Sequence, residues 1–319
     1  MAPADVVLTG ARIRVERGRW AEAIALRAGR VIALGPAEDV AVHIGHGTRV
    51  VDGAGRLVLP GFIDAHNHAP QAGRNLLGVW LNDTHGRDAY LRVIADHAAA
   101  HPGDGWIVGG GWAMEYFPGG TPRREDLDAV VGDRPVFLFN RDVHGAWVST
   151  AALRAGGITR DTPDPVDGRI ERDERTGDPT GTLHEGAAYS FSDHIVPAPT
   201  MDEIVAGILR AQRHLHALGV TSWQDAWVTP ATQAAYQALA ADGRLRSRVV
   251  GALWWDRHRD LDQIGELVAR RDAVHAVAGV PGFHPSTVKI MTDGVLENGT
   301  GALLEPYCLR HGHGSHEAD

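Results

Sequence analysis

Two histidines and an aspartate stand at alternate positions in the segment LPGFIDAHNHAP, residues 59–70. In an extended strand, side chains two residues apart point to the same face, so Asp64, His66 and His68 would lie on one side. Neutral imidazoles are ordinary ligands of zinc and related divalent metals, so two of them on one strand can bind the same ion. The alternative is a polar strand end with its histidines in solvent. For an isolated His-x-His this alternative is favoured, because chance produces the pattern easily in a chain with 18 histidines.

A lysine raises a similar question later in the chain. Lys289 stands in STVKIMTDG, a segment expected to be a strand, in which positions 287, 289 and 291 would face inward. Burying an ammonium group is costly unless the group is paired or modified. The alternative places Lys289 at the end of the strand, where its flexible stem reaches solvent. Composition alone leaves both open, and a His-x-His on a strand of the same sheet favours a functional lysine.

Alternating strands and helices surround these residues. Thr200 and Glu203 form a capping-box pair that predicts the start of a helix, and Gly219 predicts its end. Repeated units of this kind predict parallel strands joined by helical crossovers. Four strands of half a (β/α)8 barrel, a TIM barrel in an α/β protein, are therefore expected. They span about residues 62–68, 220–225, 248–254 and 287–292.

Two other regions depart from this pattern. Residues 5–59 contain short apolar segments separated by glycines, with a hairpin around Gly29, which predicts a small β domain over residues 1–58. The stretch of about 70–199 is too long for a structureless loop, so it is predicted to be a subdomain inserted into a partial barrel domain over 59–319. Its segments WIVGGGW and PVFLFN are expected to be strands.

Composition excludes several classes of protein. The 319 residues carry a net charge of −9 with scattered basic residues, which is untypical of a nucleic-acid-binding protein. Cys308 is the only cysteine, so an intrachain disulfide and a multi-cysteine metal site are excluded. The sequence has neither a signal-peptide pattern nor about 18 consecutive apolar residues, so no membrane association is expected. These features favour a cytoplasmic protein.

Six segments stand in a recognisable order along the chain. They are PGFIDAHNH, GGGWAMEYF, RDVHGAWVSTAAL, PTGTLHEGA, GVTSWQDA and VKIMTDGVLENGTGALLEPY. In that order they resemble successive motifs of amidohydrolase family 3, in the branch that includes N-substituted formamide deformylase. The likeness covers nearly the whole chain. The first motif is typical of the superfamily, and the last is specific to this branch.

The resemblance implies a distorted (β/α)8 barrel and a small β-sandwich, formed by the N-terminal segment and normally completed by the C-terminal one. It also implies a divalent metal centre of one or two ions, with zinc expected, at the C-terminal ends of the barrel strands. His66 and His68 match the metal ligands of the first strand. Lys289 matches the fourth-strand lysine that is carboxylated and bridges two metals in binuclear members. Asp64 matches a residue that supports the first strand and the histidines.

The activity implied by the resemblance is hydrolysis of a non-peptide C–N bond, in an amide or an N-substituted formamide. Family members use the metal to acidify a bound water and to polarise the carbonyl, and an aspartate after the eighth strand shuttles the proton. A mononuclear deaminase of the same superfamily is an alternative. Because those deaminases lack the fourth-strand lysine, Lys289 argues against it. A catalytically incomplete fragment that binds at most one metal weakly is a second alternative.

The family pattern continues beyond the residues present in this chain. Two further metal-binding histidines and the eighth-strand aspartate would follow, so the chain is expected to be the N-terminal part of a longer enzyme, without the catalytic aspartate. The terminal RHGHGSHEAD contains His311, His313 and His316, which are expected to open a connecting loop rather than to bind metal. Unpaired strand edges also predict poor solubility or association, for example as a homo-oligomer.

Four residues of the motifs are predicted to contact substrate: Trp112, His144, Glu185 and Asp293. Each has an ordinary alternative. His144 could be a loop histidine bonded to backbone, and Trp112 and Glu185 could pack the insertion. Asp225 and Asp293 fall at strand ends, where barrel enzymes collect active-site residues, and either could support a metal ligand.

Two further pairs of side chains invite a functional interpretation that their spacing argues against. His214 and His216 lie two apart on a predicted helix, which turns them by about 200°, so they cannot share a metal. Trp254 and Trp255 are expected to pack or to line the pocket, since no basic groove accompanies them.

Overall fold

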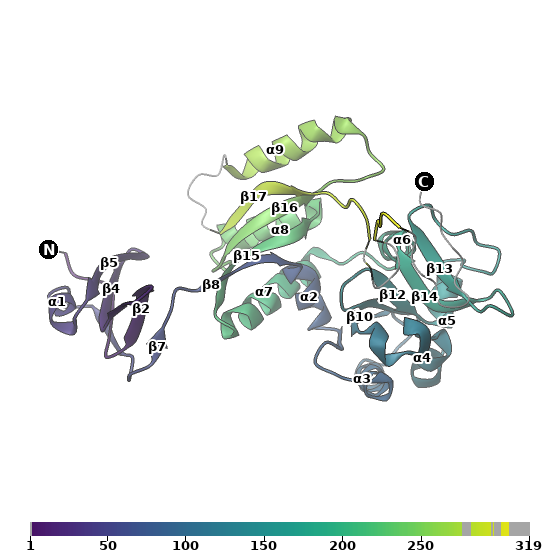
Figure 1. Ribbon diagram of the computed structural model, residues 1–319, viewed down its shortest axis with the longest axis horizontal. Helices are drawn as coiled ribbons and strands as arrows, with labels where there is room; N and C mark the ends of the chain where they lie inside the picture. Colours follow the sequence, from purple (N-terminus) through teal and green to yellow (C-terminus); the bar gives the residue numbers. More distant parts are fainter. Residues whose placement is uncertain (1, 276–281, 295, 297–300, 306–319) are drawn as a thin grey trace. The chain divides into compact units, whose positions relative to one another are not determined.

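The computed structural model describes residues 2–275, 282–294, 296 and 301–305 (Figure 1). The chain divides into two compact units, Met1–Phe62 and Ile63–Asp319. Cys308 and the three terminal histidines named above lie outside the described residues. The candidate site residues His66, His68 and Lys289 all belong to the second unit.

The N-terminal unit consists of two small sheets and a short helix. Its elements are β1 (Val6–Thr9), β2 (Arg12–Glu16), β3 (Arg19–Ala21), β4 (Ala23–Arg27), β5 (Arg30–Gly35), α1 (Ala37–Ala41), β6 (Arg49–Asp52) and β7 (Leu57–Val58). One sheet has the order β5-β4-β1-β6 and the other β3-β2-β7. The predicted hairpin is confirmed, because β4 and β5 pair antiparallel across Ala28 and Gly29, whose φ values are 48° and 72°. Positive φ at both central residues is typical of a type I′ turn.

The second unit contains an open four-stranded sheet. Its strands, and the helices that accompany them, are β8 (Phe62–Asn67), α2 (Ala69–Asn75), α7 (Met201–Ala217), β15 (Val220–Val228), α8 (Pro230–Ala241), β16 (Arg248–Trp254), the 3-10 helix η3 (Leu261–Gln263), α9 (Ile264–His275) and β17 (Phe283–Lys289). The strand order is β17-β16-β15-β8, and β16 pairs parallel with both β15 and β17. The eight-stranded barrel stays a prediction, because the described residues form this open sheet.

The helix predicted from the capping box is confirmed. The Thr200 hydroxyl accepts the backbone N–H of Glu203, and the Glu203 carboxylate accepts the backbone N–H of Thr200, so α7 begins where the sequence indicates. The helix ends at Ala217, and Gly219 follows it with a φ of 81°. Glycine adopts this left-handed conformation without a steric penalty, which ends the helix just before β15.

The predicted fourth strand is wrong at both ends. It was expected over 287–292, and β17 spans Phe283–Lys289. Pro285 does not end the strand, because it lies beside a bulge in the pairing with β16, between Gly251 and Ala252, where a missing N–H is tolerated. Phe283 and Pro285 are buried. Lys289 is therefore the last residue of its strand rather than a middle one.

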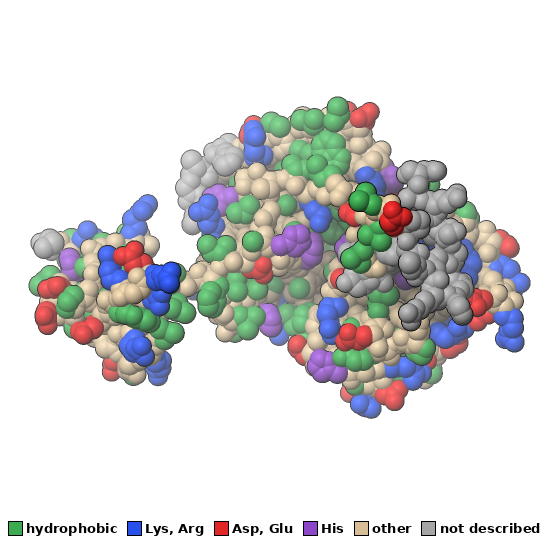
Figure 2. Space-filling view, in the orientation of Figure 1, with side chains coloured by type: hydrophobic (Ala, Val, Ile, Leu, Met, Phe, Trp, Pro, Cys, Tyr) green, Lys and Arg blue, Asp and Glu red, His purple; other side chains and the backbone are tan. Residues whose placement is uncertain are grey.

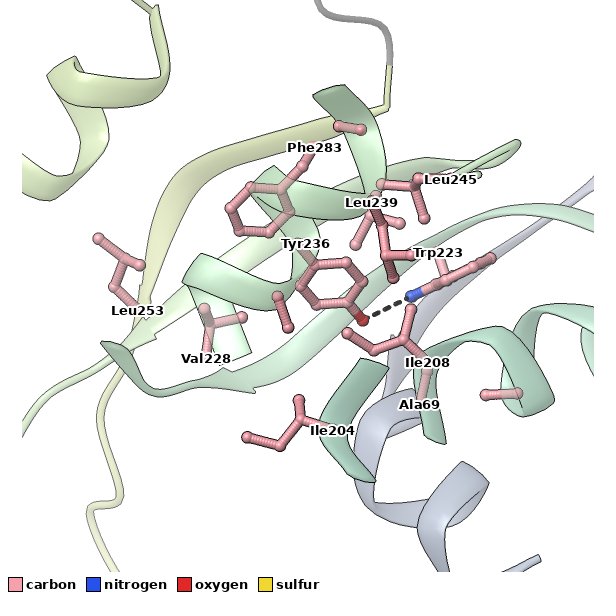
Figure 3. Close-up of a cluster of buried hydrophobic side chains, with 14 of the residues drawn as sticks. Ala69, Ile204, Ile208, Trp223, Val228, Tyr236, Leu239, Leu245, Leu253 and Phe283 are labelled. Carbon is pink, nitrogen blue, oxygen red and sulfur yellow. Dashed lines mark hydrogen bonds between the residues drawn. The ribbon is translucent and has the colours of Figure 1, made fainter. Parts of the chain in front are cut away.

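A hydrophobic core lies on the helical side of this sheet (Figure 3). Trp223 from β15, Tyr236 from α8 and Phe283 from β17 are each at most 2% exposed. The rings of Tyr236 and Phe283 stack at 4.8 Å, and the Trp223 indole N–H donates to the Tyr236 hydroxyl at 3.4 Å. Each buried aromatic ring contributes about 2 to 3 kcal/mol, so these contacts hold three elements of the sheet layer together.

Two helices of the second unit approach each other through glycines. Gly73 lies in α2 and Gly207 in α7. A Cβ atom added at Gly73 would stand 1.9 Å from the carbonyl oxygen of Gly207. Because no side-chain atom fits in this contact, the backbones of the two helices meet directly. α2 begins immediately after His68 and was not predicted from the sequence.

The residues between α2 and α7 form a second sheet with its own helices. Its elements are β9 (Val79–Trp80), α3 (Arg87–Ala100), β10 (Ile107–Trp112), the 3-10 helices η1 (Met114–Tyr116) and η2 (Pro118–Gly120), α4 (Arg124–Val131), β11 (Val136–Asn140), β12 (Gly145–Val148), α5 (Thr150–Ala155), β13 (Gly168–Arg172), β14 (Pro179–Glu185) and α6 (Gly186–His194). The strand order is β13-β14-β12-β11-β10-β9. The strands expected at WIVGGGW and PVFLFN are confirmed as β10 and β11.

The surface carries charges of both signs, interspersed over the face in view (Figure 2). No helix in the described part of the chain is long and apolar enough to cross a membrane. Some apolar side chains of the four-stranded sheet are exposed, among them Ile63 at 76% and Val288 at 47%. Since β17 stands at the edge of that sheet, association through this region stays a prediction.

Candidate functional site

His66 and His68 lie where β8 passes into α2. His66 is the second-to-last residue of β8 and is exposed, whereas His68 is partly buried and forms the N-cap of α2. Their rings meet edge to face, with centroids 5.5 Å apart and an interplanar angle of 89°. The Asp64 carboxylate accepts the backbone N–H of His66 at 3.0 Å and the side-chain amide of Asn67 at 3.0 Å. Asp64 therefore supports the backbone that carries the two imidazoles.

The environment of His68 favours an uncharged ring. Its Nδ1 is buried, and no described residue forms a hydrogen bond with it. Burial, together with the nearby charges of His66, Lys289 and His144, lowers the pKa of His68 to about 4. A neutral imidazole with an unsatisfied buried nitrogen has the properties of a ligand for a divalent metal.

Lys289 is partly buried at the end of β17. It stands opposite Trp254 in the parallel pairing of β16 and β17, so the two side chains share one face of the sheet. On β17, the Thr287 hydroxyl accepts the side-chain amide of Gln224 at 3.2 Å. The charge of Lys289 lowers the pKa of both His68 and His144, which places the amine near both imidazoles.

The insertion contributes a hydrogen-bonded triad. His144 Nδ1 lies 2.9 Å from Glu185 Oε2, and because a carboxylate only accepts, this nitrogen carries the hydrogen. The Tyr189 hydroxyl donates to the same Glu185 oxygen at 3.2 Å. The hydrogen bond to Glu185 raises the pKa of His144, and burial raises that of Tyr189. The triad fixes the tautomer of His144.

Glu185 adopts a strained backbone conformation at the start of α6. Its φ is 47° and its ψ is −122°, in a region that residues other than glycine rarely occupy. A Cβ added at the next residue, Gly186, would stand 1.9 Å from Asp167 Oδ1, so a side chain there would require the Asp167 carboxylate to move. Strain of this kind persists only where the surroundings hold it, and it is concentrated at functional sites.

Sequence reasoning missed two aromatic residues of this region. The Trp227 ring, near the end of β15, lies 6.2 Å from the His68 ring, 5.7 Å from the Tyr189 ring and 4.8 Å from the Trp254 ring. Trp227 follows the motif GVTSWQDA by one residue, and Tyr189 lies four residues after Glu185. The i, i+4 spacing on a helix was the signal that could have linked Tyr189 to Glu185.

Two residues predicted to contact substrate, Trp112 and Asp293, form other contacts in the structure. The predicted substrate contact of Trp112 does not fit its position, because its side chain is 1% exposed, donates to the Leu138 carbonyl at 2.8 Å and packs against Phe117 and Trp147. Trp112 therefore packs the insertion. Asp293 is exposed and accepts the backbone N–H of Ala302 at 3.0 Å, and its substrate contact stays a prediction.

Asp225 lies in the core on the helical side of the sheet, where it contacts Tyr236 of α8. Its carboxylate is completely buried and accepts the backbone N–H of Trp227 at 3.1 Å and the hydroxyl of Tyr236 at 3.0 Å. Burial raises the pKa of this carboxyl from an ordinary value of 3.8 to about 7, because desolvation outweighs the two hydrogen bonds.

We expect Asp225 to make stability depend on pH. Its raised pKa means that the folded state holds a proton that the unfolded state releases, so the stabilising contribution is complete below about pH 4 and is lost as pH rises through about 7. Asp225→Asn, which stays uncharged, should therefore gain about 2 to 3 kcal/mol of stability relative to the native chain as pH rises from 5 to 8. Denaturant unfolding of both proteins across this pH range measures the difference. Parallel pH profiles would contradict the assignment.

The described residues provide an incomplete set of metal ligands. No group of three or more His, Cys, Asp or Glu side chains that could hold a metal ion occurs among them. His66, His68 and Lys289 are the candidate ligands at the end of the sheet where the strands finish. His214 and His216 both lie in α7, and His216 Nε2 is 2.7 Å from the Ser247 hydroxyl, so neither belongs to this site.

A separate hollow of about 940 Å³ opens on the insertion. Arg87 of α3, Asp126 of α4 and charged side chains of the β13–β14 hairpin line it, and Arg123 there pairs with Asp173 at 3.3 Å. None of the candidate site residues lines this hollow. We therefore do not assign it to the chemistry of His66 and His68.

The chain is similar to several known proteins. Residues 49–319 match the family profile described as Amidohydrolase family. The chain is 31% identical over 249 residues to N-substituted formamide deformylase from Arthrobacter pascens, covering 76% of this chain and 46% of that protein. It is 31% identical over 224 residues to protein LONG AFTER FAR-RED 3 from Arabidopsis thaliana, covering 70% of this chain and 38% of that one.

Solved structures share the fold. An uncharacterized metal-dependent hydrolase from Pyrococcus horikoshii superimposes with a TM-score of 0.64 at 24% identity, covering 95% of this chain and 57% of the other. The chain thus spans roughly 40 to 60% of the length of these three proteins, whose covered shares are 46%, 38% and 57%.

Proposed function

The chain belongs to the amidohydrolase family, and from this premise we propose that it hydrolyses a C–N bond other than a peptide bond, in an amide or an N-substituted formamide. The observation that carries the proposal is the state of His68. Its imidazole is uncharged, its Nδ1 is buried without a described hydrogen-bond partner, and His66 and Lys289 lie beside it. A site of this kind suits a divalent cation better than a structural hydrogen bond.

His66, His68 and Lys289 would hold the metal, for which zinc is the proposed ion. Imidazole nitrogens are ligands that zinc prefers, and carboxylation would turn the Lys289 ammonium into an anionic oxygen ligand. When bound, the cation would supply a Lewis acid that activates water and polarises the carbonyl of the substrate. The carboxylated lysine and the number of ions belong to this proposal.

His144 would bind and orient the substrate. Glu185 and Tyr189 keep the hydrogen on its Nδ1 and prevent rotation of the ring, so the imidazole has one fixed orientation near Lys289. A rotation-locked side chain positions a reacting group without paying the entropy of ordering at each turnover. The strained Glu185 backbone contributes to this fixed geometry.

A second candidate is a fragment that binds metal weakly and has no activity of its own. The observation that favours it is the absence, within the described ranges, of a third His, Cys, Asp or Glu beside His66 and His68. Two imidazoles and one lysine do not form a closed coordination shell for zinc.

Metal removal tests the proposal. The chain is treated with a chelator, dialysed free of it and then titrated with zinc, while hydrolysis of simple N-substituted formamides and amides is followed by release of the amine. We expect hydrolysis to disappear on chelation and to return with zinc, with one or two ions bound per chain. Zinc binding below one ion per chain without turnover supports the fragment. Full turnover in the presence of chelator would overturn the proposed chemistry.

A further inference from the structure

One side chain from each strand of the four-stranded sheet forms a row at the end where the strands finish. His68 directly follows β8, Trp227 is the second-to-last residue of β15, Trp254 is the last residue of β16, and Lys289 is the last residue of β17. Since the strand order is β17-β16-β15-β8, the two tryptophans lie between the amine and the imidazole.

Ring contacts show that the row is continuous. The Trp227 and Trp254 rings stack, with centroids 4.8 Å apart and an interplanar angle of 23°. Trp227 also meets the His68 ring at 6.2 Å and 75°, and Trp254 is paired with Lys289 across the strands. The aromatic surface therefore extends from one candidate metal ligand toward the other.

Tyr189, in α6 of the insertion, contacts the row at Trp227. Its ring stands edge to face on Trp227 at 5.7 Å and 84°. Its hydroxyl bonds to Glu185 and contacts His144 Nδ1 at 3.1 Å, and its ring packs against the buried cluster of the insertion. Tyr189 is thus held in place, and it presents a fixed ring to the Trp227 side chain.

The two tryptophans are not explained by packing of the core. Trp223 and Val228 of β15 belong to the buried cluster on the helical side of the sheet, whereas Trp227 and Trp254 are only partly buried and belong to none of the buried clusters. Large aromatic rings bury 150–250 Å² each when they are covered, so leaving two of them partly exposed forgoes stabilisation. A ligand that covers both rings, beside the candidate metal site, is the simplest reason for their partial exposure.

The charges around the row decide what kind of ligand it suits. Tryptophan faces also bind cations, but the positively charged Lys289 stands at one end of the row. The positive charge of Arg257 also lies close enough to Tyr189 to oppose the rise in its pKa. The Glu185 carboxylate accepts hydrogen bonds from His144 and Tyr189. A metal bound at His66 and His68 would add further positive charge. An uncharged planar group is therefore favoured over an ammonium group.

We propose that Tyr189, Trp227 and Trp254 form a subsite for an aromatic, uncharged substituent of the substrate, next to the bond that is hydrolysed. This inference rests on the proposed function for the position of that bond, but binding at the subsite does not require turnover. The substrate class is thereby narrowed to amides or formamides that carry an aryl group.

Equilibrium binding tests this subsite. The probes are acetanilide, its saturated analogue N-cyclohexylacetamide and the cation phenyltrimethylammonium, each titrated calorimetrically into the zinc-loaded chain. We expect acetanilide to bind about 3- to 10-fold more tightly than the saturated analogue, the advantage typical of aromatic contacts. In Trp227→Leu and in Trp254→Leu this ratio should fall below about 2.

A matched variant separates the subsite from general damage. Trp20→Leu removes a 45% exposed tryptophan of the N-terminal unit and should leave the ratio unchanged. Equal binding of the two amides to the native chain, an unchanged ratio in both tryptophan variants, or tighter binding of the cation would each overturn the subsite. Hydrolysis without aryl preference would defeat this inference alone, whereas aryl-selective binding without hydrolysis would defeat only the proposed function.

Discussion

His68→Asn is expected to weaken zinc binding by about 100-fold or more and to abolish any zinc-dependent hydrolysis. Loss of residues that merely orient a ligand typically costs 10–100-fold in metal affinity, so loss of a direct ligand should cost at least as much. The His68 ring has a buried nitrogen without a described hydrogen-bond partner, and burial lowers its pKa to about 4, which keeps the ring uncharged. Competition with a chromogenic zinc indicator on the chelator-treated chain measures the affinity.

His214→Asn is the matched control for this experiment. His214 belongs to another His-x-His pair of the chain, is exposed on α7 and cannot share a metal with His216. We expect this variant to bind zinc as the native chain does. If both variants lose the same affinity, zinc binds nonspecifically to histidines, and the site at the end of β8 is refuted.

Much of the second unit could be predicted because local sequence rules and tertiary packing agree there. Thr200 and Glu203 cap α7 in the way their spacing indicates, and Pro230 begins α8. The limits of β17 were predicted wrongly because they depend on burial of Phe283 and on a bulge in its pairing with β16, neither of which local spacing reveals. α2 was missed because the strand motif and the helix follow one another with only His68 between them.

The residues of the candidate site differ in the same way, since local sequence predicts some of them and not others. His66, His68 and Lys289 were predicted because each stands in a motif with strand periodicity. Tyr189 and Trp227 were missed, because their contact joins α6 of the insertion to β15 and has no fixed separation in sequence. Strand alternation is also interrupted by the bulge that follows Asp225, so the facing of Trp227 could not be counted from its neighbours.

Gly73→Ala is expected to lower the free energy of unfolding by about 3 kcal/mol or more, because the new methyl group would overlap backbone atoms rather than a movable side chain. The added Cβ would lie 1.9 Å from the Gly207 carbonyl oxygen and 2.6 Å from its carbonyl carbon, so α2 and α7 must separate. His68 is the N-cap of α2, and the variant should therefore also weaken zinc binding. Urea unfolding followed by tryptophan fluorescence measures the stability.

Gly265→Ala provides the comparison, since it makes the same substitution in α9 at a position where an added Cβ meets nothing within 4 Å. Alanine has the higher helix propensity, so this variant should be as stable as the native chain or more stable by up to about 1 kcal/mol. A lower free energy of unfolding in Gly73→Ala but not in Gly265→Ala distinguishes an effect of close packing from one of helix propensity. If the two variants unfold at the same urea concentration, the backbones of α2 and α7 are not in contact, and the support that this packing gives to His68 is lost with it.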